Sequence, residues 1–256
     1  MKDSGLRVDD LVILGRSSPD RLRDNRISVC TAGYSRTLGF IRLYPTRIDS
    51  PLKVWNIVSV QVERNPMDNR AESWKIVGAK SEWDRLSNRI TVMGELKRGE
   101  RLSLVGSLKS DCVKDLEEQG RSLGIVKPAR KECYFSDRAD HDTTIQKTLF
   151  GGDTISDKHA YKLQPRVKYV CTGCQLDKGH DQQILEWGVY EWMRKNPGKE
   201  GQVWENLFWK EDQQEVYFLV GNQARRPSSF MVISFLRIAK PKGPLSRIQS
   251  PASSTR

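Results

Sequence analysis

The chain has 256 residues, 37% of them hydrophobic and 29% charged, which is enough apolar material for a buried core. It contains no run of about 18 apolar residues, and this argues against a membrane-spanning protein. The 43 Lys and Arg outnumber the 32 Asp and Glu, so the net charge of +11 favours a polyanionic partner such as DNA, RNA or an acidic protein.

The first half of the chain is predicted to consist mostly of strands. Short segments rich in β-branched and aromatic residues are separated by Gly, Pro, Asn and Asp. This pattern is typical of a small barrel or sandwich, not of alternating strands and helices. The predicted strands are 10–15, 27–33, 38–44, 54–64, 74–78 and 90–97.

The second half mixes strands with helices. Residues at helical spacing from 181 to 195 give the clearest helix pattern of the chain, with Asp181 as its N-terminal cap. Short helices are also predicted at 109–121 and 203–209, and a long polar loop at 136–160. The predicted strands are 124–128, 132–135, 165–171, 215–221 and 229–237.

Cysteine content bears on the compartment. Five cysteines are an odd number, and the chain is far longer than a disulfide scaffold. Because the first ten residues, MKDSGLRVDD, lack the apolar stretch of a signal peptide, we expect reduced thiols and a cytoplasmic protein.

The stretch YVCTGCQLDKGH, residues 169–180, is a candidate metal site. Cys171 and Cys174 form a C-x₂-C pair, which on a turn supplies two zinc ligands, and His180 is close enough in sequence to be a third. The stretch contains no fourth ligand, and nothing local selects one. The remaining candidates are Cys133, His141 and His159.

Two other interpretations of the C-x₂-C pair stay open. A redox pair would need a thioredoxin-like βαβ context, and the predicted helix begins several residues after the second cysteine. The other interpretation is a strand end that carries ordinary buried or half-buried thiols.

Five short blocks of sequence carry a family resemblance. They are CTAGYSRTLGFIRLYPT (30–46), VWNIVSVQVERNPMDNRAESWKIVG (54–78), SLGIVKP (122–128), C-x₂-C…HD…LEW (171–187) and EVYFLVGN (215–222). Through these blocks the chain resembles, over most of residues 8–237, a family of prokaryotic proteins with a dual OB domain. The resemblance implies two small barrels of the oligonucleotide-binding kind, encoded near mobile-element and defence genes, and it brings no catalytic residues.

We therefore predict an α+β fold, mostly β with some α, made of two small OB-like barrel modules. A helix follows the C-x₂-C turn in the second module. The predicted boundaries are 1–108 for an N-terminal barrel, 109–238 for a C-terminal β-rich domain and 239–256 for a disordered basic tail.

Barrels of this kind bind single strands through a basic face whose aromatic side chains stack on bases. In the segment 38–44 the side chains of Phe40, Arg42 and Tyr44 share one face, and Ile41 and Leu43 share the other. The alternative is an amphipathic strand with a buried aromatic face. The predicted nucleic-acid-binding residues are Phe40, Arg42, Tyr44, Arg47, Arg64, Arg70, Trp74, Lys75, Lys168, Arg225 and Arg226.

Catalytic motifs are few. Glu95 and Lys97 form an E-x-K of the type used by metal-dependent nucleases, with Asp68 or Asp84 as the second metal ligand. The run 140–142, Asp-His-Asp, reads as solvated surface. Walker, nucleophile-elbow and dinucleotide-binding motifs do not occur.

Three functions from different classes follow from these patterns. The first is a non-catalytic nucleic-acid-binding subunit of a prokaryotic defence or mobile-element complex, for which single strands are the favoured ligand. The second is a protein–protein adaptor in such a complex, whose basic surface meets an acidic partner. The third is a metal-dependent nuclease that uses Glu95 and Lys97. One structural zinc is the only cofactor that the sequence indicates.

Overall fold

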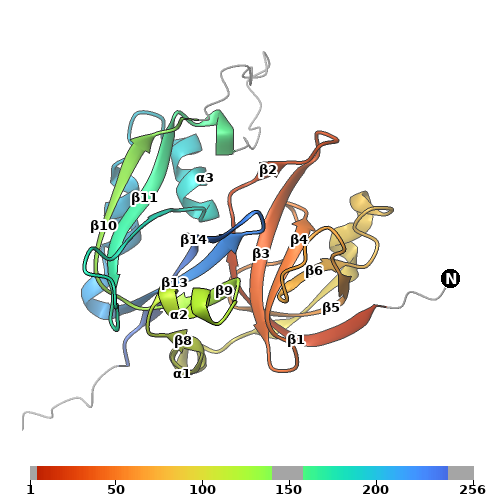
Figure 1. Ribbon diagram of the computed structural model, residues 1–256. Coiled ribbons are helices and arrows are strands. Elements are labelled where there is room, and N and C mark those ends of the chain that lie inside the picture. Colours follow the sequence, from red (N-terminus) through yellow and green to blue (C-terminus); the bar gives the residue numbers. More distant parts are fainter. Residues whose placement is uncertain (1–4, 140–157, 242–256) are drawn as a thin grey trace, which may run out of the picture.

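The computed structural model describes residues 5–139 and 158–241. The fold is mostly β with a few helices, and its strands form two lobes that lie side by side (Figure 1). The first lobe contains β1 to β7, and the second contains β8 to β14. Within the described ranges no helix is both long and apolar enough to cross a membrane.

The first lobe is a closed barrel of five strands, because β5 pairs with β1 as well as with β6. The order around the barrel is β1, β3, β4, β6, β5, and only the neighbours β4 and β6 are parallel. Outside this ring β2 pairs with β3, and β7 pairs with β5. The strands are β1 (Leu6–Arg16), β2 (Asp20–Arg21), β3 (Ile27–Ser35), β4 (Gly39–Thr46), β5 (Asn56–Arg64), β6 (Ser73–Ile76) and β7 (Ile90–Glu95).

The barrel closes around side chains that occur at every second position of its strands. In β5, Val58, Val60 and Val62 are buried in the core. Ile41 and Leu43 of β4 join the same core. The opposite face of β4 therefore points out of the barrel, as the alternation in the sequence predicts.

The second lobe contains two small sheets with the orders β10-β11-β12 and β14-β13-β9-β8. They are connected where β9 runs into β10 with only Lys127 between them, and where Ile184 and Val232 form an isolated parallel bridge. The strands are β8 (Lys109–Ser110), β9 (Leu123–Val126), β10 (Pro128–Asp137), β11 (Leu163–Cys171), β12 (His180–Gln183), β13 (Gln214–Gln223) and β14 (Arg226–Ala239).

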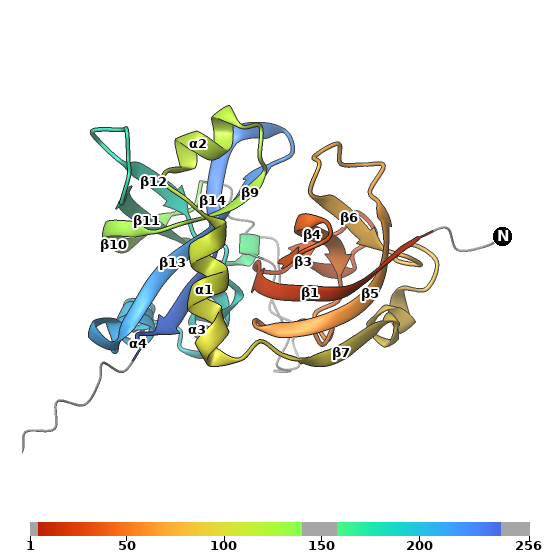
Figure 2. The same ribbon diagram turned by 90° about the horizontal axis from the view of Figure 1, so that it is seen from below.

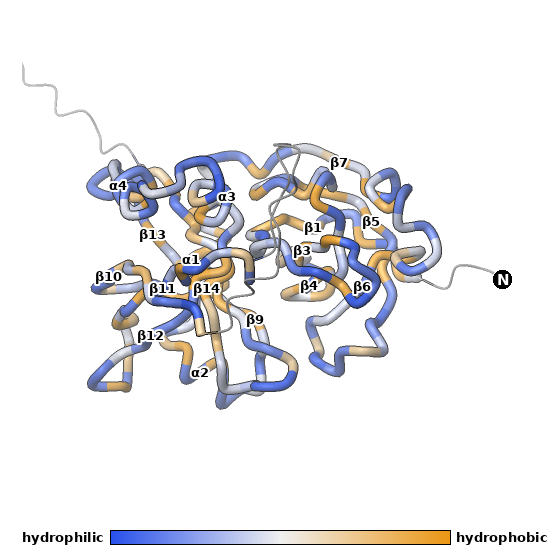
Figure 3. Tube along the Cα trace, turned by 90° about the horizontal axis from the view of Figure 1, so that it is seen from above, coloured by the Kyte–Doolittle hydropathy of each residue, from blue (hydrophilic) through white to orange (hydrophobic). Residues whose placement is uncertain are grey.

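Four α-helices complete the described structure: α1 (Arg98–Leu108), α2 (Val113–Glu118), α3 (Trp187–Lys195) and α4 (Gln202–Phe208). Short 3₁₀ turns occur at Trp83–Arg89, Lys158–Ala160 and Glu211–Gln213. Figure 2 shows α1 between the two lobes. In Figure 3 the hydrophobic stretches gather in the strands inside the lobes, and most outer loops are hydrophilic.

Some helices differ from those predicted from the sequence. The helix expected at 181–195 begins at Trp187, because residues 180–183 form β12 instead. Asp181 therefore lies in a strand and caps no helix. Helix α1 was not expected. Strand β10 continues to Asp137, two residues into the loop predicted at 136–160. Residues 140–157 of that predicted loop and most of the predicted tail lie outside the described residues.

The outward face of β4 packs against the second lobe. Phe40 is 7% exposed and belongs to a buried apolar cluster with members from both lobes and from α1. Burial of this shared surface gives the two lobes a common core. Its buried members include Val12, Leu14, Ala32 and Phe40 from the first lobe, Val105 from α1, and Leu123, Ile125, Leu219, Ile233 and Leu236 from the second.

Arg42 bridges the lobes through a buried guanidinium group. It is 5% exposed, and it donates to the carbonyl oxygens of Asn222 (3.0 Å) and Ser122 (2.8 Å) in the second lobe. Ser122 in turn donates from its backbone N–H (2.9 Å) and hydroxyl (2.7 Å) to the carboxylate of Glu72. Arg70 also donates to the carbonyl of Asn222 (2.5 Å). These bonds hold the chain of the second lobe against the outward face of β4 and the residues just before β6.

A second seam is formed by backbone contacts. The N–H of Ser18 donates to the carbonyl of Leu185 (2.5 Å), and Ser17 forms a bridge with Glu186. The N–H of Leu185 donates to the carbonyl of Val232 in β14 (2.7 Å). Residues 184–186 thus connect β14 to the first lobe.

Replacing Arg42 with methionine is expected to lower the free energy of unfolding by about 2 to 4 kcal/mol, because two carbonyl groups at the seam lose a charged donor. Chemical denaturation measures the change. The matched variant Arg36→Met, at an exposed position, is expected to stay within about 0.5 kcal/mol of the wild type. Equal effects of the two substitutions would contradict a bridging role.

Glu186 is expected to make stability depend on pH. Burial raises the pKa of its carboxyl group from 4.5 to about 7, although Phe235 donates a backbone N–H to it (2.6 Å). Because the folded state holds the proton of Glu186 more tightly than the unfolded state, this group stabilises the fold at pH values below its unfolded pKa. That contribution is lost as the pH rises through about 7. Urea denaturation of wild type and Glu186→Gln should therefore show the variant gaining relative stability from about pH 5 to about pH 8; a constant difference would refute this.

Candidate metal centre and nucleic-acid interface

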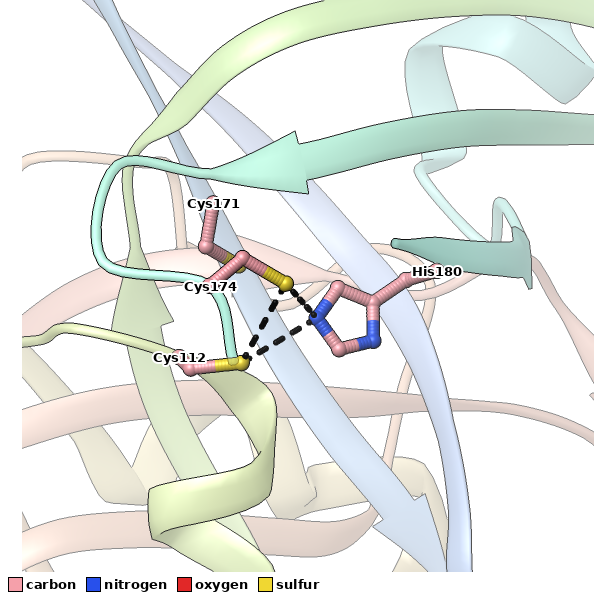
Figure 4. Close-up of side chains that lie close together, drawn as sticks. All are labelled: Cys112, Cys171, Cys174 and His180. Atoms are coloured by element: carbon pink, nitrogen blue, oxygen red, sulfur yellow. Dashed lines mark hydrogen bonds between the residues drawn. The ribbon is translucent and has the colours of Figure 1, made fainter. Parts of the chain in front are cut away.

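Four side chains from three segments of the second lobe converge on one point. The sulfur atoms of Cys112, Cys171 and Cys174 and a ring nitrogen of His180 all lie within 4.8 Å of one another. Figure 4 shows the four side chains directed toward a common centre. The cluster connects the start of α2 to the turn between β11 and β12.

Local structure fixes each member of the cluster. Cys112 stands at the N-terminus of α2, where its backbone N–H donates to Asp115 (2.8 Å) in a capping box. Cys171 ends β11, and the N–H of Cys174 donates to its carbonyl in a tight turn (3.2 Å). His180 begins β12, directly opposite Tyr169 of β11.

The distances in the cluster suit a tetrahedral zinc ion. With bonds of about 2.3 Å to sulfur and about 2.0 Å to nitrogen, tetrahedral geometry places two sulfur ligands about 3.8 Å apart and a sulfur and a nitrogen about 3.5 Å apart. The two sulfur atoms of Cys112 and Cys174 are 3.7 Å apart. The Nε2 atom of His180 lies 3.3 Å from the sulfur of Cys112 and 3.5 Å from that of Cys174.

Burial shifts the pKa values of side chains in the cluster. Cys112 and Cys171 are buried, and burial raises the pKa of both thiols. Burial lowers the pKa of His180 and so favours the neutral imidazole that binds metals. Three sulfurs and one imidazole fill a tetrahedral shell without a vacant position, which is typical of structural and not of catalytic zinc.

The structure brings together the three ligands that the sequence predicted, Cys171, Cys174 and His180, and adds Cys112. Among the candidates for the fourth ligand, Cys133 lies half-buried in β10 and His159 lies in a 3₁₀ turn, and neither is part of the cluster. His141 lies outside the described residues. Cys112 lies inside the short helix predicted at 109–121, so no local pattern marked it as a ligand.

Three of the predicted nucleic-acid-binding residues are buried, and for them the prediction is wrong. Phe40 and Trp74 are 7% and 8% exposed, so neither ring has a free face on which a base could stack. Phe40 lies between the lobes, and Trp74 belongs to the barrel core with the guanidinium of Arg64 4.0 Å from its ring. Arg42 is used in the seam between the lobes.

Three further predicted cations are paired with carboxylates. Arg47 pairs with Asp49 (2.8 Å) and Asp84 (3.4 Å). The other pairs are Arg70 with Asp68 (2.5 Å) and Lys75 with Glu63 (3.1 Å). These side chains are less available to phosphates than unpaired cations would be. Tyr44 is half-buried and lines a cavity between the lobes.

The remaining predicted cations are exposed. Arg64 lies over Trp74, whereas Lys168, Arg225 and Arg226 belong to the second lobe. Lys168 is on the outer face of β11, with its amino group 5.1 Å from the centre of the Tyr134 ring. Arg225 and Arg226 lie in the hairpin that joins β13 to β14. Among the described residues none of these four cations forms an ion pair.

A groove of about 640 Å³ lies between β12 and the start of β14. Residues 179–182 form one side and residues 226–230 the other, so Arg226 contributes directly to its wall. Asp181, on the first side, lies opposite Lys168 in the register of β11 and β12. Its carboxylate accepts a hydrogen bond from Tyr134 (2.8 Å) and forms an ion pair with Arg166 (3.0 Å). Tyr134 and Arg166 were not among the predicted binding residues.

The proposed nuclease residues do not gather into a metal site. Glu95 pairs with Arg101, and Asp68 is held by Arg70 and by the hydroxyl of Ser73 (2.7 Å). In the described ranges, the cysteine and histidine cluster is the group of three or more ligand side chains that could hold a metal ion. The Asp-His-Asp run at 140–142 lies outside these ranges.

Two family models match the chain. One, described as a domain of unknown function (DUF8758), matches residues 7–104, and another, described as a domain of unknown function (DUF8757), matches residues 110–253. The second match spans more than half of the chain. The chain belongs to the DUF8757 family. The DUF8757 segment contains all four residues of the cysteine and histidine cluster and the groove, whereas the closed barrel falls in the DUF8758 segment.

Comparisons with characterised proteins add little to the family assignment. A search of curated proteins finds no match. Among solved structures, a murine DNA-binding protein in complex with double-stranded DNA is 10% identical, and the match covers 93% of this chain and 98% of that chain with a TM-score of 0.32. A TM-score this low does not establish a common fold.

Proposed function

We propose that this DUF8757 protein is a non-catalytic nucleic-acid-binding protein that holds a single strand along the groove between β12 and β14. The observation that carries the proposal is the set of exposed cations beside this groove, Lys168, Arg225 and Arg226, which have no carboxylate partner among the described residues. Phosphates supply the missing counter-charge, and Tyr134 offers a ring at the same surface.

We also propose that each lobe is an OB-like module. In the second lobe β9 and β10 act as one bent strand, so the ring runs β9–β10, β11, β12, β14, β13. This repeats the first lobe's order of first, second, third, fifth and fourth strand, and in both rings the third and fifth strands are parallel. Such Greek-key barrels bind oligonucleotides across their second and third strands.

The two modules differ in whether that surface is accessible. In the first lobe the face of β3 and β4 is covered, since Phe40 and Arg42 contact the second lobe. In the second lobe the outer face of β11 and β12 carries the exposed Lys168 and Asp181. The second lobe is therefore the binding module of the proposal, and the first lobe supports it.

We further propose that Cys112, Cys171, Cys174 and His180 bind one structural zinc ion. The support is the agreement between the cluster distances and a tetrahedral shell of three sulfurs and one nitrogen. The ion would attach α2 to the β11–β12 turn and so fix one wall of the groove, since residues 179–182 follow that turn.

The resemblance to prokaryotic dual OB proteins suggests that the chain is a subunit of a defence or mobile-element complex. A second function, as a protein–protein adaptor, is favoured by one observation. The indole of Trp209, at the end of α4, is 71% exposed, and tryptophan is enriched where binding energy is concentrated at interfaces.

Zinc content tests the metal proposal. The purified protein is expected to contain about one zinc per chain, and Cys112→Ser and Cys174→Ser should each lose most of it and lower the free energy of unfolding by at least about 3 kcal/mol. Inductively coupled plasma mass spectrometry and chemical denaturation give the two readouts. Cys133→Ser is the matched control and should keep its zinc; full zinc in Cys112→Ser would exclude Cys112 as a ligand.

Salt-dependent binding to single-stranded oligonucleotides tests the function. The double variant Arg225→Ala/Arg226→Ala is expected to bind at least about tenfold more weakly, and the slope of log affinity against log salt should become shallower by about 1.4. Fluorescence anisotropy across a salt series measures both quantities.

The control for this experiment is Arg23→Ala/Arg85→Ala, which removes two exposed cations of the first lobe and changes the net charge equally. It should retain close to wild-type affinity. Equal losses in the two double variants would mean that only the overall charge attracts the strand. No binding at low salt, together with co-purification of a partner protein, would favour the adaptor.

A further inference from the structure

A cavity of about 300 Å³ lies at the seam between the two lobes. Its walls come from both lobes: Ser18, Arg42, Tyr44 and Arg70 on one side, and β12, the β13–β14 hairpin and β14 on the other. The volume is at the lower end of the range found for small-molecule sites.

Two buried polar atoms on the wall of this cavity lack partners. Within the described residues, the side-chain nitrogen and oxygen atoms that are buried without a hydrogen bond are Nε of Arg16, Oγ of Ser18 and Nε of Arg42. Ser18 and Arg42 both line the cavity, and they are only 2% and 5% exposed. Buried polar atoms are nearly always hydrogen-bonded, so a polar group that reached these two side chains from the cavity would be favourable.

The charge of the cavity wall is unbalanced at Arg42. Arg70 is paired with Asp68, and Lys158 is paired with Asp20 (2.6 Å). Arg42 forms no ion pair in the described part of the chain, and the acceptors of its hydrogen bonds are neutral oxygens of residues 122 and 222. The carboxylates of Asp68 and Glu72 act on the charge of Arg42 without contacting it, so its buried guanidinium group still gains from an anionic group in the adjoining cavity.

The rest of the wall suits a ring. Leu185, Met231 and Ile233 provide an apolar surface, and Tyr44 provides an aromatic ring with a hydroxyl group. A ligand that fits this wall has a compact apolar or aromatic part and one strongly acidic group, at a size of roughly 300 Å³ or less.

The cavity adjoins the groove of the proposed function. Gln183 lines the cavity and follows residues 179–182, which line the groove. The hairpin likewise contributes to both, with residues 221–224 on the cavity and residues 226–230 on the groove. The same two segments therefore line the groove and the cavity.

We propose that the cavity between the lobes binds a single nucleotide, with its phosphate near Arg42 and Ser18 and its base against the wall formed by Leu185, Met231 and Ile233. The nucleotide is either a free mononucleotide or the phosphorylated end of a bound strand. The second source rests on the proposed function, and the first does not.

The test uses isothermal titration calorimetry and thermal unfolding of the full chain with four probes. They are the common ribonucleoside 5′-monophosphates, adenosine with inorganic phosphate as separate halves, and single-stranded oligonucleotides with and without a 5′-phosphate. Binding of one mononucleotide per chain, with a raised melting temperature and little response to either half alone, is the expected result. A preference of at least about fivefold for the phosphorylated oligonucleotide identifies the strand end as the source.

Two variants localise the binding. Ala224→Trp places an indole at the mouth of the cavity from an exposed position and is expected to abolish mononucleotide binding, whereas Ala239→Trp, an exposed site outside the cavity, should leave it unchanged. Ser18→Ala should weaken binding about tenfold, because one hydrogen bond to phosphate is lost. The ligand-free melting temperature of this variant should not fall, since the deleted hydroxyl has no partner.

The outcomes separate this proposal from the proposed function. Oligonucleotide binding that persists in Ala224→Trp, with no mononucleotide binding in the wild type, would overturn the nucleotide cavity and leave the groove intact. Mononucleotide binding that Ala224→Trp removes, with no binding of either oligonucleotide, would support the cavity and overturn the groove. Mononucleotide binding equal in Ala224→Trp and wild type would place the ligand elsewhere and refute the proposal.

Discussion

The guanidinium group of Arg42 is the contact on which the arrangement of the two lobes depends. It leaves the barrel from β4 and ends among backbone carbonyls of the second lobe, beside the apolar part of the seam. Its planar set of donors can satisfy two carbonyl groups at fixed positions, which an apolar side chain or a lysine cannot do in the same way. Burial of the surrounding apolar surface stabilises the contact between the lobes but is not directional. The charge-assisted hydrogen bonds of Arg42 fix the relative orientation of the lobes.

The same contact explains why the outward face of β4 in the first lobe is covered. The surface of β3 and β4, which in an oligonucleotide-binding barrel would meet the ligand, is used here for intramolecular packing. In the second lobe the outer face of β11 and β12 carries exposed side chains, and the same lobe contains the cysteine and histidine cluster and the groove. Of the five predicted binding cations of the first lobe, three are paired with carboxylates: Arg47, Arg70 and Lys75.

Much of the fold could be predicted from local pattern, and most errors arose where tertiary contacts decide. The strands of the first lobe follow from β-branched residues between turn residues, and the alternation in β4 correctly assigns Ile41 and Leu43 to the barrel core. The same alternation cannot tell whether Phe40 faces solvent or another lobe. The prediction at 181–195 merged β12 with α3, because Asp181 suits a helix cap and the apolar residues at helical spacing begin only at Ile184 and Leu185. Cys112 is far from Cys171 in sequence, and only the packing of α2 brings it to the other ligands.

The apolar seam has a consequence for how this sequence can change over evolutionary time. Phe40 packs under the guanidinium of Arg121, whose carbon lies 5.2 Å from the ring centre, although the two residues belong to different lobes. Neither position can drift freely, because a substitution on one side alters the shape that the other side must fit. The segments that match two separate family models should therefore be inherited as a matched pair, with correlated substitutions across the seam and few successful exchanges of one half between distant relatives.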